Sequence, residues 1–281
     1  MALPGDYKKL KNKWLNKNNK NGSPLLDSLI SISSNTVSDF YAEVSKGNIE
    51  GHAIANMQGE NLDVDSSAPE NLWSVGGLMV YPTVGEQWEV VSDSTDDTAS
   101  GIGAQAIIVQ YLDFDYNEQT EVVTLSGTTP VQMTATDCFR SINILSVQVG
   151  SSGYNQGAVS VSDTRSGNTR VRMEPLHNRS AHGFFTIPKG KTGYLIYGHS
   201  ALGKNKDGKI ELYLTEGENG IFTKNSFSDL YQNSVVFLPK APIGEIVEKT
   251  DIQFLCTTLN NNTDATAFIQ ILLVDNDLIQ D

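Results

Sequence analysis

Cysteine is scarce in this 281-residue chain, and long apolar runs are missing. The two cysteines, Cys138 and Cys256, are too few for a disulfide framework. Because each lies in an apolar run, we expect two buried free thiols. No segment approaches the ~20 apolar residues of a membrane span, and the polar, basic stretch after Met1 lacks a secretory apolar region. The sequence therefore predicts assembly in the cytoplasm without membrane association.

Sequence motifs of several enzyme classes are also missing. The chain has no G-x-S-x-G elbow, no Walker loop and no H-E-x-x-H zinc motif. The Gly101-Ile102-Gly103 segment precedes an expected strand instead of following one, so we interpret it as a turn. Nothing in the pattern singles out two carboxylates for glycoside hydrolysis. We therefore predict no enzymatic activity, no catalytic residue and no cofactor.

Two acidic loops and a histidine pair are the candidates for metal binding. Asp113–Glu118 begins with the D-x-D-x-N spacing of a calcium loop, but a Glu is needed at the twelfth position, where Thr124 stands. A polar turn bonded to its own backbone is the favoured interpretation. The acids of 93–97 could share a cation if the two loops meet. His177 and His182 lack the further ligands that zinc needs, so no metal site is predicted.

Short runs rich in Val, Ile, Thr and Tyr, separated by Gly, Asn, Asp and Ser, predict an all-β protein. We expect two consecutive antiparallel β-sandwich domains of jelly-roll-like character, over 49–178 and 179–281. Asp207-Gly208 predicts a hairpin turn, and Trp73 should be at least partly buried in an extended loop. The expected strands lie near 86–92, 104–112, 119–125, 142–149, 157–162, 169–173, 184–187, 192–196, 209–215, 233–239, 251–259 and 267–275.

The charge is distributed unevenly along the chain. Residues 1–22 hold six of the 20 basic residues and one of the 33 acidic ones, so this segment carries +5 and the remainder −18. We interpret 1–48 as a basic arm and linker, with a short apolar helical stripe after Ser23-Pro24. Attachment to another protein, a solvated tail and nucleic-acid binding are the alternatives, and the acidic remainder argues against the last. The candidate attachment residues are Lys8, Lys9, Lys11, Lys13, Trp14, Lys17, Lys20, Leu25, Leu26, Leu29 and Ile30.

Two stretches of the chain resemble a family of uncharacterised virion proteins of tailed phages, especially marine ones. The first stretch is similar to the family pattern "DTAAGTGA, strand, GLD, turn, ETVTLNGTTPV", and the second to "YTIPAGKTGYL … PEKTDI … TTNNT … ILVDN". Lys189 and Val247 depart from this pattern, and the arm lies outside it. The matching segments are 97–104, 112–113, 120–131, 186–195, 247–252, 257–263 and 271–276.

The resemblance implies a structural protein of the virion, decorating the capsid or forming a head fibre, in a homo-oligomer that is expected to be a trimer. Its partners would be major capsid, neck or tail proteins, and the basic arm would attach it to them. A tail or adsorption protein that binds a host-surface glycan is the alternative. Most strand aromatics should be core, while Tyr194 and Tyr197 could join a subunit interface or a glycan platform.

Overall fold

The computed structural model describes residues 37–231, 234–237 and 243–279. The chain divides into two units, Met1–Glu50 and Gly51–Asp281. Helix α3 (Val37–Ser45) is the described element of the first unit. It ends where Gly47 takes a left-handed conformation, with φ of 73°, and its N–H donates to the Val44 carbonyl. The attachment residues predicted between Lys8 and Ile30 lie outside the described residues.

The second unit is all-β, as predicted, and the strand pairs within it are antiparallel. Two short 3₁₀ turns, Gly217–Asn219 and Asn276–Leu278, accompany the strands. The strands are β1 (His52–Val64), β2 (Glu70–Asn71), β3 (Trp88–Ser92), β4 (Ala104–Asp113), β5 (Glu118–Thr124), β6 (Val131–Gln132), β7 (Cys138–Val149), β8 (Val159–Asp163), β9 (Thr169–Met173), β10 (Phe184–Thr186), β11 (Lys191–Leu202), β12 (Asp207–Leu214), β13 (Thr223–Tyr231), β14 (Ser234–Phe237), β15 (Ile243–Ile246), β16 (Asp251–Thr258) and β17 (Thr263–Asp275).

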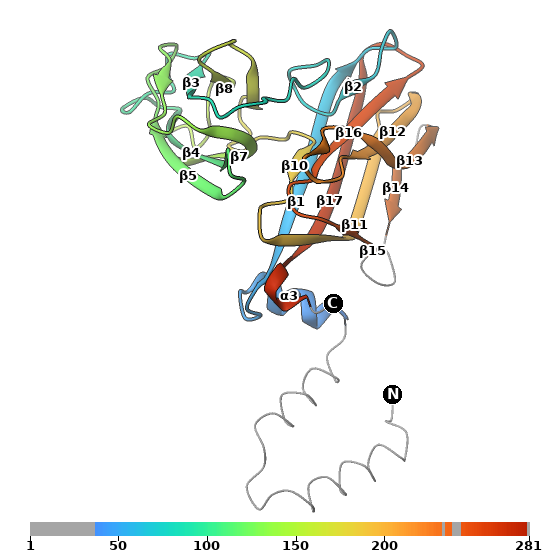
Figure 1. Ribbon diagram of the computed structural model, residues 1–281. Coiled ribbons are helices and arrows are strands. Elements are labelled where there is room, and N and C mark those ends of the chain that lie inside the picture. Colours follow the sequence, from blue (N-terminus) through green and yellow to red (C-terminus); the bar gives the residue numbers. More distant parts are fainter. Residues whose placement is uncertain (1–36, 232–233, 238–242, 280–281) are drawn as a thin grey trace, which may run out of the picture. The chain divides into compact units, whose positions relative to one another are not determined.

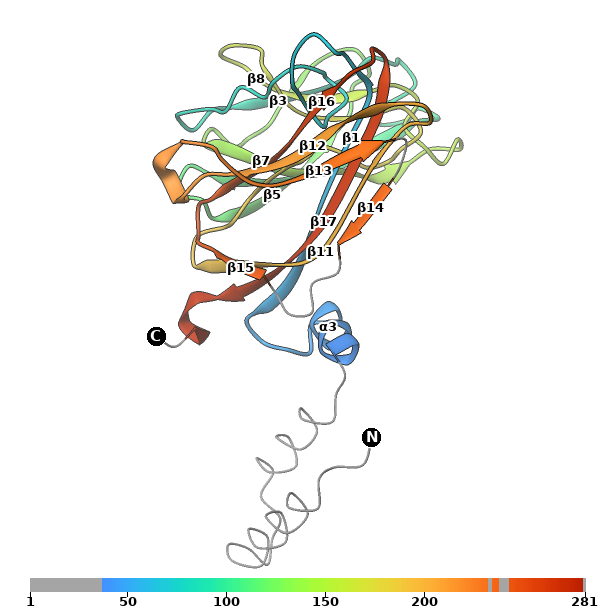
Figure 2. The same ribbon diagram turned by 90° about the vertical axis from the view of Figure 1, so that its right-hand side faces the viewer.

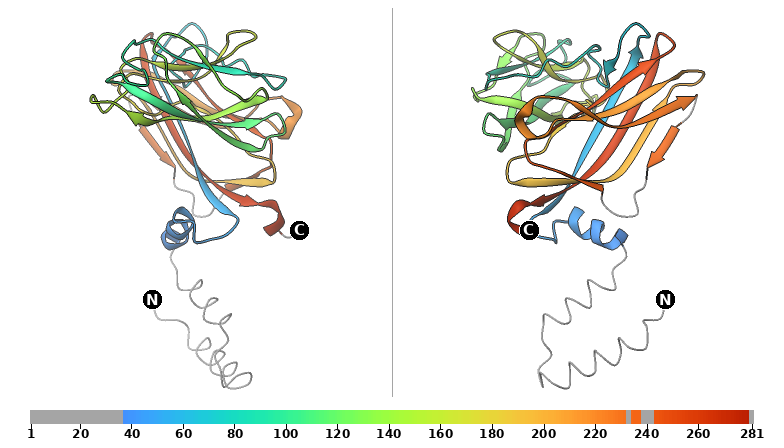
Figure 3. Two further views of the ribbon diagram at one scale, coloured as in Figure 1. Left: turned by 90° about the vertical axis from the view of Figure 1, so that its left-hand side faces the viewer. Right: turned by 45° about the vertical axis from the view of Figure 1, so that its right-hand side comes forward.

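Two of the four sheets use strands from both ends of the second unit, and we call them the terminal sheet pair. One has the order β1-β17-β11-β14 with β15 also on β11, and the other has the order β10-β16-β12-β13 with β2 on β16. Figure 2 shows β12 beside β13, and the right-hand view of Figure 3 shows blue β1 and red β17 side by side. Alternate residues such as Ile210, Leu212 and Ile271 fill one core between the two sheets.

The other two sheets come from residues 88–173, and we call them the inserted sheet pair. Their orders are β6-β3-β8-β9 and β5-β4-β7. Figure 1 labels β3 and β8 of the first sheet and β4, β5 and β7 of the second. Strands β3 and β8 each bury every second residue, which is the pattern of a strand with one face in a core. Trp88, Ile107 and Val161 are among the side chains of that second core.

Most expected strands are present, but the pairings differ from the predicted division at 178. Strand β1 pairs with β17 along its length, from His52 opposite Val274 to Val64 opposite Thr263. Residues 52–71 therefore belong to the sheets of the terminal pair and not to those of the inserted pair. Apolar and polar residues alternate poorly along β1, so the sequence did not reveal this strand. The two-sandwich arrangement of jelly-roll-like character stays a prediction.

The predicted hairpin at Asp207-Gly208 is wrong. Both residues lie inside β12, where Asp207 pairs with Tyr231 and Gly208 with both Leu230 and Thr258. The preceding strand β11 belongs to the other sheet, so the turn at 203–206 carries the chain across the core. A turn signal alone does not tell whether the two strands that flank it pair with each other.

The chain leaves and re-enters the terminal sheet pair at neighbouring points. The Gly183 N–H donates to the Leu72 carbonyl at 2.7 Å, and the Phe254 N–H donates to the Gly183 carbonyl at 3.0 Å. Glycine is needed here for space, because a Cβ on Gly59 would lie 2.8 Å from the Leu72 carbonyl oxygen and 2.9 Å from Gly183 Cα. The inserted sheet pair is thus joined to the terminal pair by two backbone segments that lie next to each other, at Leu72 and Gly183.

Candidate functional site

The junction between the two sheet pairs has a small apolar cluster of its own. Leu112, Tyr116 and Phe139 are buried together there, and Ile142 packs against them and against the terminal core as well. Phe139 meets Tyr116 edge to face, with ring centroids 5.3 Å apart. Ile142 thus links this cluster to the terminal core. The junction is therefore a packed contact and not a solvated gap.

A buried ion pair crosses the junction. Arg140 on β7 donates from Nε and Nη2 to the two carboxylate oxygens of Asp251 on β16, each at 2.9 Å, and both side chains are more than nine-tenths buried. Thr186 also donates to Asp251, at 2.6 Å. The two-point geometry fixes direction as well as distance. Because a buried charge needs its partner, this pair ties one sheet pair to the other.

Aromatic rings enclose the Arg140 guanidinium. Its central carbon lies 3.9 Å from the Phe139 ring centroid, 5.2 Å from that of Tyr81 and 5.9 Å from that of Tyr116. Such rings attract a cation through their faces. Burial first, and then the Asp251 charge, raises the pKa of Tyr81 well above its usual value. Tyr81 therefore stays neutral and serves as a wall of the junction.

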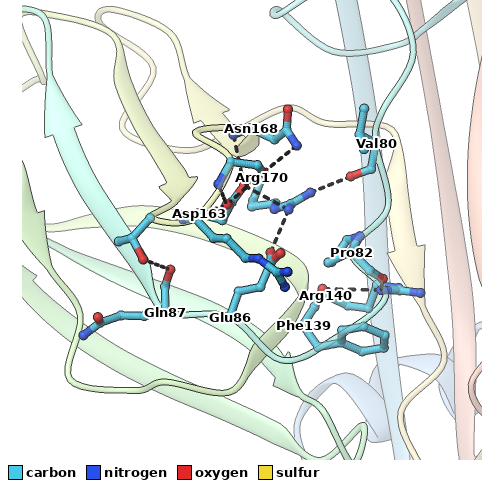
Figure 4. A network of polar contacts seen from close by, with 12 residues as sticks. Val80, Pro82, Glu86, Gln87, Phe139, Arg140, Asp163, Asn168 and Arg170 are labelled. Atoms are coloured by element: carbon cyan, nitrogen blue, oxygen red, sulfur yellow. Dashed lines mark hydrogen bonds and ion pairs between the residues drawn. The ribbon is translucent and has the colours of Figure 1, made fainter.

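A second arginine holds the segment that leads into the inserted sheet pair (Figure 4). Arg170 on β9 is 2% exposed and bonds Glu86 at 2.7 Å and Asp163 at 3.0 Å through Nη2. Its Nη1 donates to the Val80 carbonyl, as Arg140 Nη1 does to the Pro82 carbonyl. Two buried cations thus hold the backbone of 80–82. The segment 80–82, which leads into the inserted sheet pair, therefore has a defined path.

Hydrogen bonds and charge keep Asp163 ionised in this network. Burial alone would raise its pKa, but hydrogen bonds from Ser166 and the Arg170 charge outweigh burial, so the pKa is lowered. Asn168 N–H adds a further bond to Asp163 at 3.0 Å. The carboxylate is thus fully ionised near neutral pH and pairs with Arg170 there.

His182 stands where the chain returns from the inserted sheet pair. Burial, as the first cause, lowers its pKa to about 4, although a hydrogen bond with the Ser141 backbone works in the opposite direction. Its ring lies 6.0 Å from that of Phe184. His177 is exposed, so the two histidines proposed as a pair have different environments. His182 is consequently neutral at pH 7, part of the packing at the junction.

The candidate calcium loop is the polar turn that the sequence favours. Asp113 Oδ1 accepts from the backbone N–H groups of Asp115 and Asn117 at 3.0 and 2.9 Å, and Oδ2 accepts from Gln119 at 2.9 Å. Burial would raise the Asp113 pKa, but these bonds outweigh it and lower the pKa. The carboxylate thus shapes the β4–β5 turn.

Asp97 of the other acidic loop plays a similar part. It is fully buried and accepts hydrogen bonds from Ser92 Oγ at 2.6 Å, Ala104 N at 2.7 Å and the amides of Gln156 and Gly157 at 2.8 Å. These donors come from three separate segments, so Asp97 holds the loops together. Among the residues that the structure describes, no three His, Cys, Asp or Glu side chains gather as a metal site.

The expectations for cysteines and aromatics have clear outcomes. Cys138 and Cys256 are free and buried, one in the inserted core and the other in the terminal core, as predicted. Trp73 is buried, also as predicted. Tyr194 and Tyr197 are half-buried on β11; Tyr194 Oη contacts Glu245 at 3.3 Å, and the Tyr197 ring packs on that of Phe268. Their proposed part in an interface or glycan platform stays a prediction.

The sequence did not reveal the junction. Arg140 and Asp251 are 111 residues apart, and no motif relates them. A signal was nevertheless present, since Arg140 interrupts the apolar start of β7, whereas the arginines of β9 alternate with its other residues and give no such signal. A charged residue inside a strand that is otherwise buried requires a partner. The arginines of this site bond backbone carbonyls and carboxylates of the same protein, and these bonds fix how the sheets are joined.

No described helix is long and apolar enough to cross a membrane. No protein-family model matches the chain, and no curated protein matches it either. Among solved structures, particles derived from infectious bursal virus align at 11% identity and a TM-score of 0.22, covering 81% of this chain and 70% of the other. The VP2 subviral particle of infectious bursal disease virus aligns at 10% identity and 0.23, covering 86% and 79%. Similarity at this level assigns neither a family nor a fold.

Proposed function

We propose that the chain is a non-enzymatic structural protein of a tailed-phage virion, decorating the capsid or forming a head fibre. The observation that carries the structural role is the clamped junction. Arg140 is buried and bonded across the junction, and Arg170 is buried and bonded to the inserted pair and the segment that leads into it, so both fix the structure instead of meeting a substrate. A particle component that must keep its shape benefits from this rigidity. The phage context comes from the sequence resemblance over about residues 50–277.

The charge distribution supports attachment through the N-terminal arm. The arm carries +5 and the remainder −18, so the two parts favour surfaces of opposite sign. We infer that Lys8–Lys20 and the apolar residues of 25–30 contact an acidic capsid or neck surface, while the acidic body stays in solvent. We infer assembly in the host cytoplasm from the polar, basic start of the sequence, and a homotrimer from the resemblance. Nucleic acid and membrane are not expected partners.

Cryo-electron microscopy of purified virions that carry this chain tests the location. Density for the two sheet pairs on the capsid lattice, continuous with the arm, is the expected result. Density on the tail would instead favour the adsorption alternative. Absence of the chain from the particle would overturn the structural role altogether.

A binding experiment tests the arm separately. Particles that lack the chain are mixed with purified protein and sedimented, and the variant changes the six arm lysines to Gln. We expect this variant to stay in the supernatant at salt concentrations where the unmodified protein sediments. Equal sedimentation of the two would overturn the role of the arm. The matched control changes six lysines of the body to Gln, namely Lys189, Lys191, Lys204, Lys206, Lys209 and Lys224.

A further inference from the structure

A cleft of about 290 Å³ opens between the terminal and inserted sheet pairs. Residues 53–56 of the edge strand β1 form one wall, and strands β4, β5 and β7 contribute the other. Arg179 and Phe185, from the segment that returns to the terminal sheets, complete it. Small-molecule sites span about 300–1,000 Å³. This volume lies at the lower limit of that range, so the cleft suits a small ligand and is too small for a folded partner.

The lining of this cleft is more polar than that of a usual small-molecule site. Seven of its thirteen residues carry an amide, a hydroxyl or a charge, and Phe185 is the one aromatic among them. Sites for drug-like ligands are lined mainly by apolar groups. Of these seven residues Asn143 is buried and five, including Arg179, are exposed. A matching ligand must itself be polar over most of its surface, because each polar group that it covers loses water and needs a hydrogen-bond partner.

Asn143 is the best-defined donor of the cleft. The side chain is 7% exposed, and its Oδ1 accepts from Ser180 Oγ at 2.7 Å. Ser180 is itself fixed, since its Oγ accepts from the Ile144 N–H at 3.1 Å. The orientation of the Asn143 amide is thereby set, and Nδ2 has no acceptor among the described residues. The protein holds a hydrogen-bond donor ready at the cleft wall.

Two further amides are tethered at one end in the same way. Asn56 Oδ1 accepts from Gln270 at 3.0 Å, which directs its Nδ2 as a donor. Gln119 Nε2 donates to Asp113 at 2.9 Å, which leaves its Oε1 as an acceptor. The lining therefore offers two tethered donors and one tethered acceptor. A hydroxyl group can satisfy either kind, whereas a purely donating or accepting ligand satisfies one.

Arg179 supplies the positive charge of the cleft. Its backbone is held on the edge of β7 by a bridge to Leu145, and the neighbouring Asn178 carbonyl accepts from the Ser146 N–H at 2.9 Å. No acceptor for the guanidinium is found among the described residues. The acid of the lining, Glu118, has Lys191 nearby at 3.9 Å. A planar guanidinium without a protein partner is suited to a carboxylate, which it can bind at two points.

We propose that this cleft binds an acidic saccharide, a ring with several hydroxyls and one carboxylate. The carboxylate pairs with Arg179, and the hydroxyls bond to Asn143, Asn56 and Gln119, while Phe185 contacts an apolar face of the ring. The site is separate from the arm and from the buried Arg140–Asp251 pair. The proposed binding therefore does not depend on where the chain is located on a particle.

The test uses the purified full chain with two probes, D-galacturonate and neutral D-galactose, in ligand-detected NMR and titration calorimetry. Arg179→Gln removes the charge, and Asn143→Asp replaces the donor while its oxygen can still accept from Ser180. Arg165→Gln, an exposed arginine outside the cleft lining, is the matched control. Circular dichroism verifies that each variant is folded.

We expect saturable binding of galacturonate, weakened at least about tenfold by Arg179→Gln and by Asn143→Asp and unchanged by the control. Galactose should bind more weakly than galacturonate by a similar factor. Absence of galacturonate binding, equal binding by the Arg179 variant, or equal affinity for the neutral sugar would each overturn the proposal. None of these outcomes bears on the virion experiments.

Discussion

The inserted and terminal sheet pairs reach similar architectures by different routes. The inserted pair uses one contiguous stretch, 88–173, in which β4 and β5 form a hairpin and β8 and β9 another. The terminal pair closes only when β1 meets β17, with Gln58 opposite Phe268. Each has one apolar core between two sheets. A complete sheet pair can thus be inserted into the sequence of another when the two ends of the insertion lie side by side, as Leu72 and Gly183 do.

The two sheet pairs also differ in where buried charge is used. The inserted pair is held at its loops by two buried carboxylates, Asp97, which accepts from backbone amides and the Ser92 hydroxyl, and Asp163, which pairs with Arg170. In the terminal pair the buried carboxylate Asp251 faces outward to the junction and meets Arg140. Buried charge therefore stabilises loops within the inserted pair, whereas in the terminal pair it stabilises the contact with the inserted pair.

Each sheet pair contains one natural reporter. Burial, as the largest cause, raises the pKa of both the Cys138 and Cys256 thiols to about 12. Neither thiol reacts readily with an alkylating reagent in the folded state, because the thiolate is the reactive form. Reaction at Cys138 then reports opening of the inserted core, and reaction at Cys256 reports opening of the terminal core.

The largest expected effect comes from breaking the ion pair that joins the sheet pairs. Arg140→Met leaves Asp251 buried without its cation, so unfolding free energy should fall by about 3–5 kcal/mol in denaturant titrations. Cys138 and Cys256 should then become reactive at different denaturant concentrations. The control is Arg172→Met, whose half-buried pair with Glu174 is expected to contribute below about 1 kcal/mol. A loss below about 1 kcal/mol for Arg140→Met would refute the junction as described.

A pH titration examines the return point at His182. The folded pKa of about 4 lies below the ordinary value of 6.5, so the unfolded chain binds the proton more readily. The contribution of neutral His182 to the free energy of unfolding is complete above pH 6.5. It is lost as pH falls toward 4, by roughly 3 kcal/mol in total. Glutamine at this position should flatten that part of the stability profile. An unchanged slope between pH 6.5 and 4 would contradict a buried neutral His182.

Closure of the terminal sheet pair can be disturbed alone. In Gly59→Ala the new methyl group would press on Leu72 and Gly183, so a loss of about 1–3 kcal/mol is expected. Alkylation rates followed by mass spectrometry should rise at Cys256 more than at Cys138. Gln58→Ala, at the exposed neighbouring position, should stay within about 0.5 kcal/mol of the unmodified protein. Equal acceleration at both thiols would show that the two cores open together.

The smallest expected effect concerns a second contact between the sheet pairs, at the surface. Lys249 bonds Glu218 at 2.6 Å and lies 5.4 Å from the Tyr116 ring centroid. Because this pair is solvent-exposed in part, Lys249→Met should change stability by less than about 1 kcal/mol, and less still in high salt. Denaturant titrations at two ionic strengths measure this. A larger, salt-independent loss of unfolding free energy would show that Lys249 contributes more to joining the sheet pairs than the Arg140–Asp251 pair accounts for.

The sequence predicted the strands well where alternation is strong and failed where distant segments meet. β3 and β12 alternate cleanly between core and surface, so local pattern was enough to find them. β1 was missed because Gly59 and Asn61 stand at core-facing positions, filled by packing from elsewhere. The pairing of Arg140 with Asp251 depends on three-dimensional proximity, and one sequence holds no record of it.

The pairing of β1 with β17 has a consequence during synthesis. Strand β1 leaves the ribosome early, yet its partner Phe268 lies 210 residues beyond Gln58. At about 5–20 residues per second, β1 waits some 10–40 s for that partner. The inserted sheet pair, already complete by then, can fold first and bring Leu72 and Gly183 together. Strand β1 therefore spends this interval without its native partner, and slower synthesis would lengthen the interval in which its edge can pair with another chain.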